Sequence, residues 1–186
     1  MKKLLSVLLV LLLTSSMAWA KKVGDYDVPD TLKAGSENLA LNGAGFRTKI
    51  GMKLYVGSLY TQKPAKDEKA IIDADAPMAI TLHIVSGLIT SEKMMTAINE
   101  GFENSTGGNI APLKKDIDTF VSVFKTEIKE GDKQQFIYVP GTGVEIYKNG
   151  AKVNTIAGIA FKKALFGIWL CDKPADGDLK DAMLAK

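Results

Sequence analysis

Alternating apolar and polar positions, which are typical of β-strands with one buried face, recur along much of this chain. The segments that carry this pattern are 39–50, 52–62, 78–85, 133–141 and 143–158. In the second of them, Tyr55 and Leu59 share one face of the predicted strand. Asn149-Gly150 divides the last segment and is the strongest short-range signal for a tight hairpin. The pattern therefore predicts strands that are joined largely by short turns.

Apolar residues recur every third or fourth position in three further segments, and this spacing predicts helices with one buried face. These segments are 90–105, 111–131 and 161–170. Thr90 or Ser91 can cap the first helix, and Gly131, the last residue of the second segment, stands just past the end of the predicted helix. Two shorter charged segments, 63–77 and 176–186, can form additional short helices.

The order of these elements predicts an α+β fold. Strands that follow one another through short turns pair antiparallel, and helices inserted between them gather on one face of the sheet. We assign no element to the polar segment 21–37, which precedes the first predicted strand. No repeat, linker or low-complexity segment interrupts the chain, so we expect a single domain over residues 21–186.

The first twenty residues predict a cleaved secretory signal. Lys2 and Lys3 precede the apolar stretch "LLSVLLVLLL", and the segment ends in Ala18-Trp19-Ala20, a typical cleavage motif. Ten residues rise only about 15 Å as a helix, whereas a membrane span needs about 20 apolar residues. We therefore expect cleavage after Ala20, a periplasmic location, and no stable membrane anchor after cleavage.

Composition disfavours several classes of function. After cleavage, 22 Lys and Arg face 21 Asp and Glu, and no basic run occurs, so we expect no nucleic-acid partner. A single cysteine, Cys171, cannot form an internal disulfide, and the single histidine, His83, has no second ligand at metal-binding spacing. "GAGFR" at 43–47 lacks the third glycine of a dinucleotide-binding motif. We expect neither metal nor cofactor, and the sequence does not indicate the oligomeric state.

Arg47 is the candidate that composition leaves unexplained. A guanidinium keeps its charge at every working pH and is costly to remove from water without an anion. Arg47 is therefore either a surface residue, one half of a structural ion pair, or the charge in an apolar cavity between sheet and helices. In such a cavity Tyr55 would offer a hydroxyl, and Leu, Met and Phe side chains would hold an apolar tail.

Two stretches resemble the chalcone isomerase-like family, specifically its exported bacterial branch. They are "GAGFRTKIGMKLYVGSLY" and "YVPGTGVEIYKNGAKVNTIAGIAFKKALFGIWLCDKPADGDLK". The likeness extends over roughly residues 39–184, and it depends on the order and spacing of the motifs more than on any single one. It implies an antiparallel sheet with helices layered on one face and a ligand cleft between them.

The resemblance also implies positions for site residues. In plant enzymes of the family an arginine steadies the phenolate that closes chalcone to flavanone, while hydroxyl and amide side chains hold the rest of the substrate. The arginine matches Arg47 and the first threonine position falls at Tyr55. The remaining tyrosine, asparagine and threonine positions fall near Thr90, Ala97 and Ile168. Only the arginine is therefore retained, with a different hydroxyl beside it.

Three functional hypotheses follow. Related fatty-acid-binding members hold a carboxylate with arginine and tyrosine, so the first is a non-catalytic protein that binds a small amphipathic anion through Arg47 and Tyr55. The second is an isomerase, an intramolecular lyase that acts on a conjugated carbonyl of a phenolic substrate. The third is an envelope interaction domain in which the cleft is closed and Arg47 is ion-paired.

Overall fold

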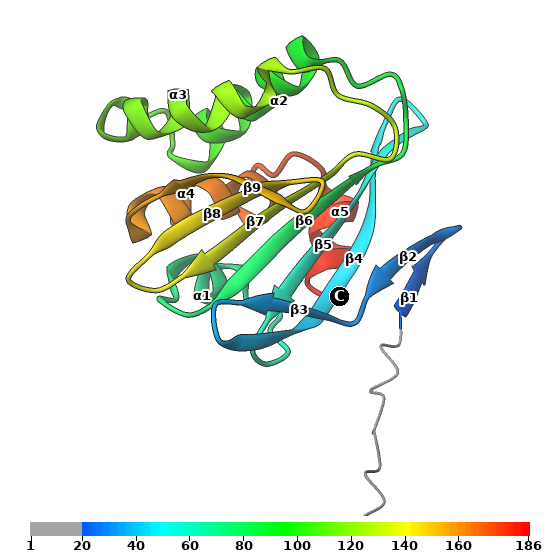
Figure 1. Ribbon diagram of the computed structural model, residues 1–186, viewed down its shortest axis with the longest axis horizontal. Coiled ribbons are helices and arrows are strands. Elements are labelled where there is room, and N and C mark those ends of the chain that lie inside the picture. The colour runs from blue at the N-terminus through cyan, green and yellow to red at the C-terminus, as the bar shows by residue number, and fades with distance from the viewer. Residues whose placement is uncertain (1–19) are drawn as a thin grey trace, which may run out of the picture.

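The computed structural model describes residues 20–186, so the predicted signal lies, except for Ala20, outside the described residues (Figure 1). The strands are β1 (Ala20–Val23), β2 (Tyr26–Pro29), β3 (Thr31–Ala34), β4 (Glu37–Lys49), β5 (Met52–Thr61), β6 (Met78–Ile84), β7 (Lys133–Val139), β8 (Gly143–Lys148) and β9 (Ala151–Ile156). The helices are α1 (Glu68–Asp73), α2 (Ser91–Ser105), α3 (Lys114–Ser122), α4 (Ile159–Leu170) and α5 (Gly177–Met183), with 3₁₀ helices η1 (Ala111–Leu113) and η2 (Val123–Lys125).

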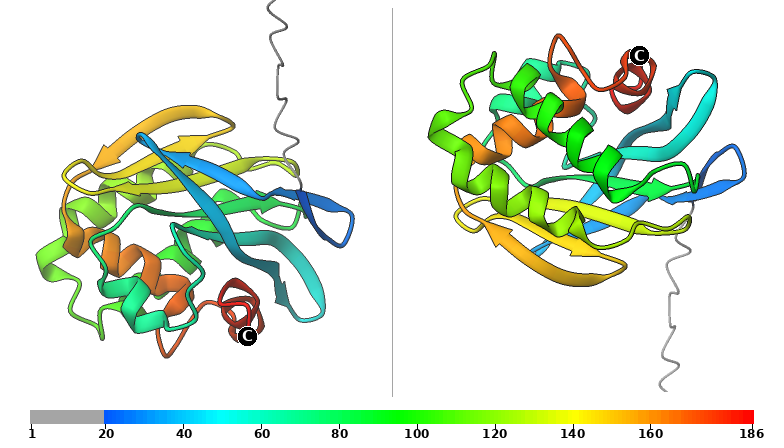
Figure 2. Two further views of the ribbon diagram at one scale, coloured as in Figure 1. Left: turned by 90° about the horizontal axis from the view of Figure 1, so that it is seen from below. Right: turned by 90° about the horizontal axis from the view of Figure 1, so that it is seen from above.

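Seven strands form one antiparallel sheet in the order β3-β4-β5-β6-β7-β8-β9, and β1 pairs with β2 in a separate hairpin. Each strand of the sheet lies beside its neighbours in sequence, with α1 inserted between β5 and β6 and the pair α2–α3 inserted between β6 and β7. Figure 2 shows the helices gathered on one side of the sheet. The predicted α+β class, an antiparallel sheet with helices on one face, is confirmed.

Each face of the sheet packs against its own hydrophobic core. In β5, Tyr55 and Leu59 belong to the core on the helix side. Their neighbours Val56 and Tyr60 belong to the core on the other side, which the β1–β2 hairpin and β3 help to cover. This division follows the period of two that the sequence shows, because successive side chains of a strand point to opposite faces.

The N-terminal segment differs from the prediction. Residues 21–37, to which we assigned no element, contribute most of β1 and all of β2 and β3. Each strand is only four residues long and turns one buried side chain inward, namely Val23, Val28 and Ala34. An alternation this short is masked by the polar residues between, so the pattern did not reveal these strands.

The second predicted helix is shorter than its apolar stripe. Instead of running over 111–131, α3 ends at Ser122 and continues only as the short η2. Thr126 is extended, its carbonyl accepts from the Ser91 hydroxyl at 2.6 Å, and its own hydroxyl accepts from Lys148 at 2.7 Å. Ile128 is nevertheless buried. Tertiary contacts therefore stop the helix while the apolar spacing continues.

A buried lysine joins α4 to α1. The Lys162 ammonium is fully buried and donates to the carbonyl oxygens of Ile71, Ile72 and Ala74 at 2.8–2.9 Å. These carbonyls stand at the C-terminal end of α1, where helix carbonyls lack intrahelical partners and a cation is favoured. Burial lowers the pKa of Lys162 to about 8, and the neighbouring charge of Lys163 acts in the same direction.

Candidate ligand-binding cleft

A β-bulge sets Arg47 beside Tyr55. From the turn at 50–51, Lys49 pairs with Met52 and Thr48 with Lys53, but the register then shifts and Arg47 pairs with Tyr55. A shift of one residue moves a side chain to the other face of a sheet. Without it Arg47 would lie opposite Leu54, so the bulge is what brings the guanidinium to the same face as the tyrosine.

Asp176 stabilises the bulge from α5. One carboxylate oxygen caps α5 by accepting from the Leu179 amide at 2.9 Å, and the other accepts from the Thr48 amide at 2.9 Å. A bulge disrupts the ladder of hydrogen bonds between two strands, so a backbone amide at the bulge needs an acceptor from elsewhere. The start of α5 therefore fixes the residue that follows Arg47.

The glycines before Arg47 let α5 lie directly against the sheet. A Cβ at Gly43 would stand 2.1 Å from the Ala182 carbonyl oxygen, and one at Gly45 would stand 2.6 Å from the Ala182 side chain. Gly57 on β5 has the same relation to Met183 and Leu179. Close packing against α5 thus explains the glycines of the "GAG" motif.

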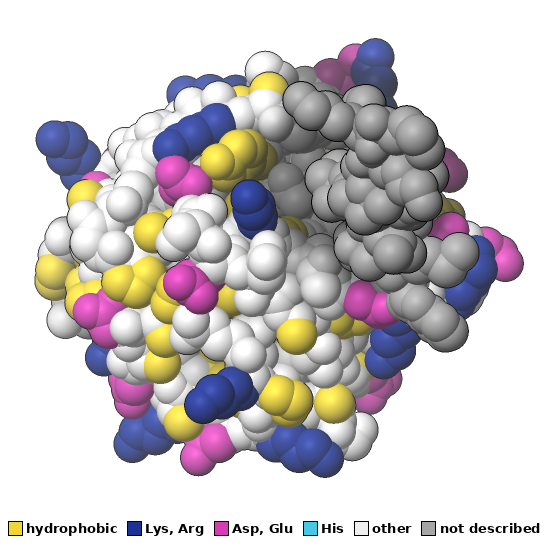
Figure 3. All heavy atoms as spheres, turned by 60° about the horizontal axis from the view of Figure 1, so that its bottom comes forward, with side chains coloured by type: hydrophobic (Ala, Val, Ile, Leu, Met, Phe, Trp, Pro, Cys, Tyr) yellow, Lys and Arg dark blue, Asp and Glu magenta, His cyan; other side chains and the backbone are white. Residues whose placement is uncertain are grey.

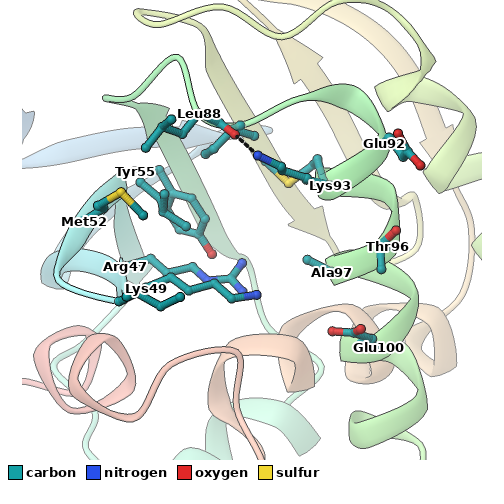
Figure 4. Close-up of a pocket in the computed structure, with 14 residues that line it drawn as sticks. Arg47, Lys49, Met52, Tyr55, Leu88, Glu92, Lys93, Thr96, Ala97 and Glu100 are labelled. Atoms are coloured by element: carbon teal, nitrogen blue, oxygen red, sulfur yellow. Dashed lines mark hydrogen bonds between the residues drawn. The ribbon is translucent and has the colours of Figure 1, made fainter.

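An open cleft of about 510 Å³ lies between the β4–β5 hairpin and α2. Figure 4 shows Arg47 and Lys49 extending from the sheet side toward α2, with the Tyr55 hydroxyl beside the guanidinium. The cleft is lined by Arg47, Lys49, Ile50, Met52, Leu54, Tyr55, Leu88, Ile89, Glu92, Lys93, Met94, Thr96, Ala97 and Glu100. Its volume lies within the range of small-molecule sites, about 300–1,000 Å³.

Arg47 is half-buried and has no counter-ion among the described residues. Its guanidinium carbon lies 5.6 Å from the centre of the Tyr55 ring. Among residues 20–186 no carboxylate forms an ion pair with it. The hypothesis of a closed cleft with an ion-paired arginine is therefore not supported by the geometry, and the guanidinium forms part of the cleft wall.

The Tyr55 hydroxyl is oriented by a neighbour that sequence reasoning missed. Trp169 on α4 donates its indole N–H to the Tyr55 oxygen at 2.9 Å, and both residues are buried, Trp169 with 3% and Tyr55 with 1% of its surface exposed. Since the oxygen accepts this bond, its own hydrogen must point elsewhere, and none of the described residues accepts it. Burial raises the pKa of Tyr55, against the opposing charge of Arg47, so the hydroxyl stays protonated.

The charges around the cleft are mixed but favour an anion at its deep end. Lys49 and Lys93 add to Arg47, while Glu92 and Glu100 stand on the α2 side. Lys93 is partly satisfied, because its ammonium donates to the Leu88 carbonyl at 3.1 Å (Figure 4). Lining cations exceed lining carboxylates by one, and only Arg47 stands beside a free hydroxyl donor.

Behind Arg47 the interior is almost filled, which corrects the expected role of the phenylalanines. A second hollow, of only about 10 Å³, shares Arg47, Tyr55, Met94 and Ala97 with the cleft. Its far wall is aromatic, formed by Phe120, Phe124, Phe136 and Trp169. These rings contact one another at centroid distances of 5.1–6.4 Å. They pack as core, and the open cleft is lined by Leu and Met but not Phe.

The structure brings together most positions that the family resemblance suggested. Ala97 lines both hollows, and Ile168 lines the inner one. Thr90 is instead the N-cap of α2, where its hydroxyl accepts from the Lys93 amide at 3.2 Å. Tyr60 lies on the opposite face of the sheet and donates to the Pro29 carbonyl at 2.9 Å, so it has no part in the cleft.

The described part of the chain contains no cluster of three or more His, Cys, Asp or Glu side chains that could hold a metal ion. His83 lies on the other face of the sheet from the cleft, where its ring meets Tyr26 edge-on at 5.2 Å. Within residues 20–186, no helix is both long and apolar enough to cross a membrane.

Fold and cleft together define an α+β protein with a ligand-sized opening between an antiparallel sheet and one helix. Residues 20–185 match the sequence model of the chalcone isomerase-like family. The chain belongs to this family, as its motifs suggested. Membership of an exported bacterial branch stays a prediction.

The fold recurs among solved structures, 36 chains of which match this protein. One is the crystal structure of a fatty-acid binding protein from Arabidopsis thaliana, with a TM-score of 0.68 and 17% sequence identity over 88% of this chain and 95% of that chain. At such an identity the likeness establishes the shared fold. No curated protein matches the sequence.

Proposed function

We propose that this protein binds a small amphipathic anion, such as a fatty acid, in the cleft between the β4–β5 hairpin and α2. Arg47 is the charge partner of the anionic head group, and Tyr55 is the second hydrogen-bond donor. The protein acts after export, in the periplasm, once the first twenty residues have been removed.

The observation that carries this proposal is a pair of adjacent donors at the deep end of the cleft that meet no anion among the described residues. The guanidinium has no ion pair among the described residues, and the Tyr55 hydrogen has no acceptor there. A carboxylate has only acceptors and can take bonds from both at once. A neutral guest would leave the arginine charge unmet in a half-buried place.

The surroundings of the donors support binding rather than ring closure. The matched asparagine and threonine positions, Ala97 and Ile168, present only carbon atoms to the hollows that they line. A phenolic ring and a polarised ketone would therefore lack most of their partners. The fatty-acid binding function of the Arabidopsis thaliana neighbour agrees with the binding role.

Calorimetric titration with octanoate and dodecanoate tests the proposal. Arg47→Ala should weaken binding by about 1.5–3 kcal/mol, the range for a hydrogen bond to a charged group. Arg47→Lys keeps the positive charge but loses the forked donors of the guanidinium, so its affinity should lie between those of the parent and Arg47→Ala. Dodecanol serves as the matched uncharged ligand.

The outcomes separate the roles clearly. A parent protein that binds dodecanol as tightly as dodecanoate would contradict an anion site. An Arg47→Ala variant that binds each carboxylate like the parent would remove Arg47 from the site. For the lyase alternative, the decay of chalcone absorbance should not exceed that in buffer.

A further inference from the structure

Exposed apolar side chains gather at the mouth of the cleft. Four large hydrophobic residues of the described chain are strongly exposed: Ile50 (89%), Met52 (44%), Leu88 (47%) and Val153 (47%). The first three all line the cleft, and only Val153 lies away from it, on β9 at the other edge of the sheet. On the face seen in Figure 3, outside the part covered in grey, hydrophobic side chains are instead scattered among charged ones.

The turn that carries Ile50 is unfavourable for this residue. Ile50-Gly51 has φ angles of 50° and 73° in a two-residue loop closed by the Lys49–Met52 pair. The β8–β9 hairpin has the same kind of loop, with φ angles of 50° and 82°, but places Asn149 at the first position. Asparagine tolerates the left-handed region, whereas a β-branched residue there is strained. Ile50 is thus a residue that folding alone would not select.

Cations flank these apolar side chains. Lys49 and Lys53 stand on either side of the β4–β5 turn, and Lys93 stands across the cleft on α2. Lys53 lies over the outer face of the hairpin, with its ammonium 4.2 Å from the centre of the Phe46 ring. The acidic residues of the cleft, Glu92 and Glu100, lie on α2 and not on the hairpin. Protruding apolar side chains between lysines match an interface of hydrocarbon and anionic head groups.

We propose that the β4–β5 turn and the loop at Leu88 dock on an anionic lipid bilayer and hold the mouth of the cleft against its surface. The membrane contact rests on the exposed residues alone. The purpose of that contact, the exchange of an amphipathic ligand between the cleft and the bilayer, rests on the proposed function. Because the aromatic wall fills the interior, the tail of a bound anion must extend past Met52 and Leu88, and docking would take that tail out of water.

Sedimentation with vesicles tests the docking. The exported form of the chain, with its N-terminus established by mass spectrometry, is mixed with vesicles of phosphatidylcholine alone or with about one-third phosphatidylglycerol. The protein should sediment with the anionic vesicles. Ile50→Asp should weaken this binding at least about tenfold, because it removes a large apolar contact and adds a repelled charge. Asp also suits the left-handed turn, so the variant should stay folded.

Matched variants control for general effects. Val153→Asp makes the same change at a side chain as exposed as Leu88 but far from the cleft, and should leave vesicle binding unchanged. Lys53→Glu should lower partitioning into anionic vesicles more than about fivefold. The change removes a positive charge that the anionic lipids attract and adds a negative charge that they repel. Lys115→Glu makes the same change of charge on α3, which lies at the other end of the molecule from the β4–β5 turn in Figure 1, and it should not lower this partitioning.

Three results would overturn docking: no sedimentation with anionic vesicles, an equal loss in Val153→Asp, or a dimer in solution that Ile50→Asp dissociates. The last would assign the mouth to a second copy of the chain. Arg47→Ala distinguishes a failure of docking from a failure of the proposed function. This variant should bind dodecanoate weakly in solution and still sediment with anionic vesicles. A parent that binds dodecanoate but no vesicles would refute docking and leave the proposed function standing.

Discussion

Replacing Tyr55 with phenylalanine separates the two hydrogen bonds of its hydroxyl. The change removes the acceptor of the Trp169 N–H, which is buried and has no other partner among the described residues. A buried donor left unpaired costs about 1–3 kcal/mol. The lost hydroxyl also had an unused hydrogen, so we expect the low end, about 1 kcal/mol. For a chain of this length that corresponds to a fall in Tm of roughly 2–4 °C.

The effect on affinity should be larger than a neutral hydrogen bond suggests. The hydroxyl of Tyr55 would donate to a charged head group, and such bonds contribute about 1.5–3 kcal/mol. Arg47 remains to hold the charge, so the loss should lie near 1.5 kcal/mol, or roughly tenfold in Kd. Because burial raises the pKa of Tyr55, the hydroxyl stays a donor well into alkaline solution, and the tenfold difference should persist from pH 7 to pH 9.

Trp169→Phe is the matched control in the same network. It removes the N–H but leaves the tyrosine hydroxyl free to donate, so dodecanoate affinity should stay within about twofold while the Tm falls. Calorimetric titration and thermal unfolding of both variants supply the two readouts. If Trp169→Phe loses as much affinity as Tyr55→Phe, the effect is one of packing, and the assignment of Tyr55 as a donor is wrong.

Two further predictions concern the scaffold. Because the pKa of Lys162 is about 8 in the folded chain against 10.5 when unperturbed, the unfolded state holds this proton longer, and the unfolding free energy should rise by up to about 2 kcal/mol from pH 8 to 10. Urea denaturation of Lys162→Met should lack that rise. Gly43→Ala should cost about 1–3 kcal/mol, since its methyl group would meet the Ala182 backbone, whereas Gly87→Ala meets open space and should cost under about 0.5. Equal Tm values for the two glycine variants would refute this packing argument.

Local signals predicted much of the fold. Asn149-Gly150 adopts the two positive φ angles that a tight hairpin needs, and α4 covers the segment whose apolar spacing predicted it. What failed depends on distant partners. The helix predicted over 111–131 ends early because Ser91 and Lys148 hold Thr126 in an extended conformation, and neither contact is visible in the local pattern.

The sequence could name the residues of the candidate site, which remain a proposal, but it could not give their geometry. Arg47 stood out because a lone guanidinium after a glycine-rich stretch needs an explanation, and the family resemblance selected Tyr55. Their proximity, however, comes from the bulge at Thr48 that Asp176 stabilises from a helix 128 residues further on. The sequence identified Trp169 only as an apolar residue of a helix and did not predict its contact with Tyr55. This residue nevertheless determines where the Tyr55 hydrogen can point, because its N–H donates to the Tyr55 oxygen.

The packed interior also decides how an amphipathic guest can lie. Arg47 borders both hollows, so a tail could in principle run inward or outward. Running inward, four methylenes would gain about 3 kcal/mol at roughly 0.8 each, yet they would have to displace a ring such as Phe120 or Phe136, and the loss of one packed phenylalanine costs about 3–5 kcal/mol. Running outward, the tail meets Met52 and Leu88 without displacing anything. In the proposed complex the head group would therefore lie deep and the tail at the mouth, where three of the four strongly exposed large hydrophobic residues of the described chain are found.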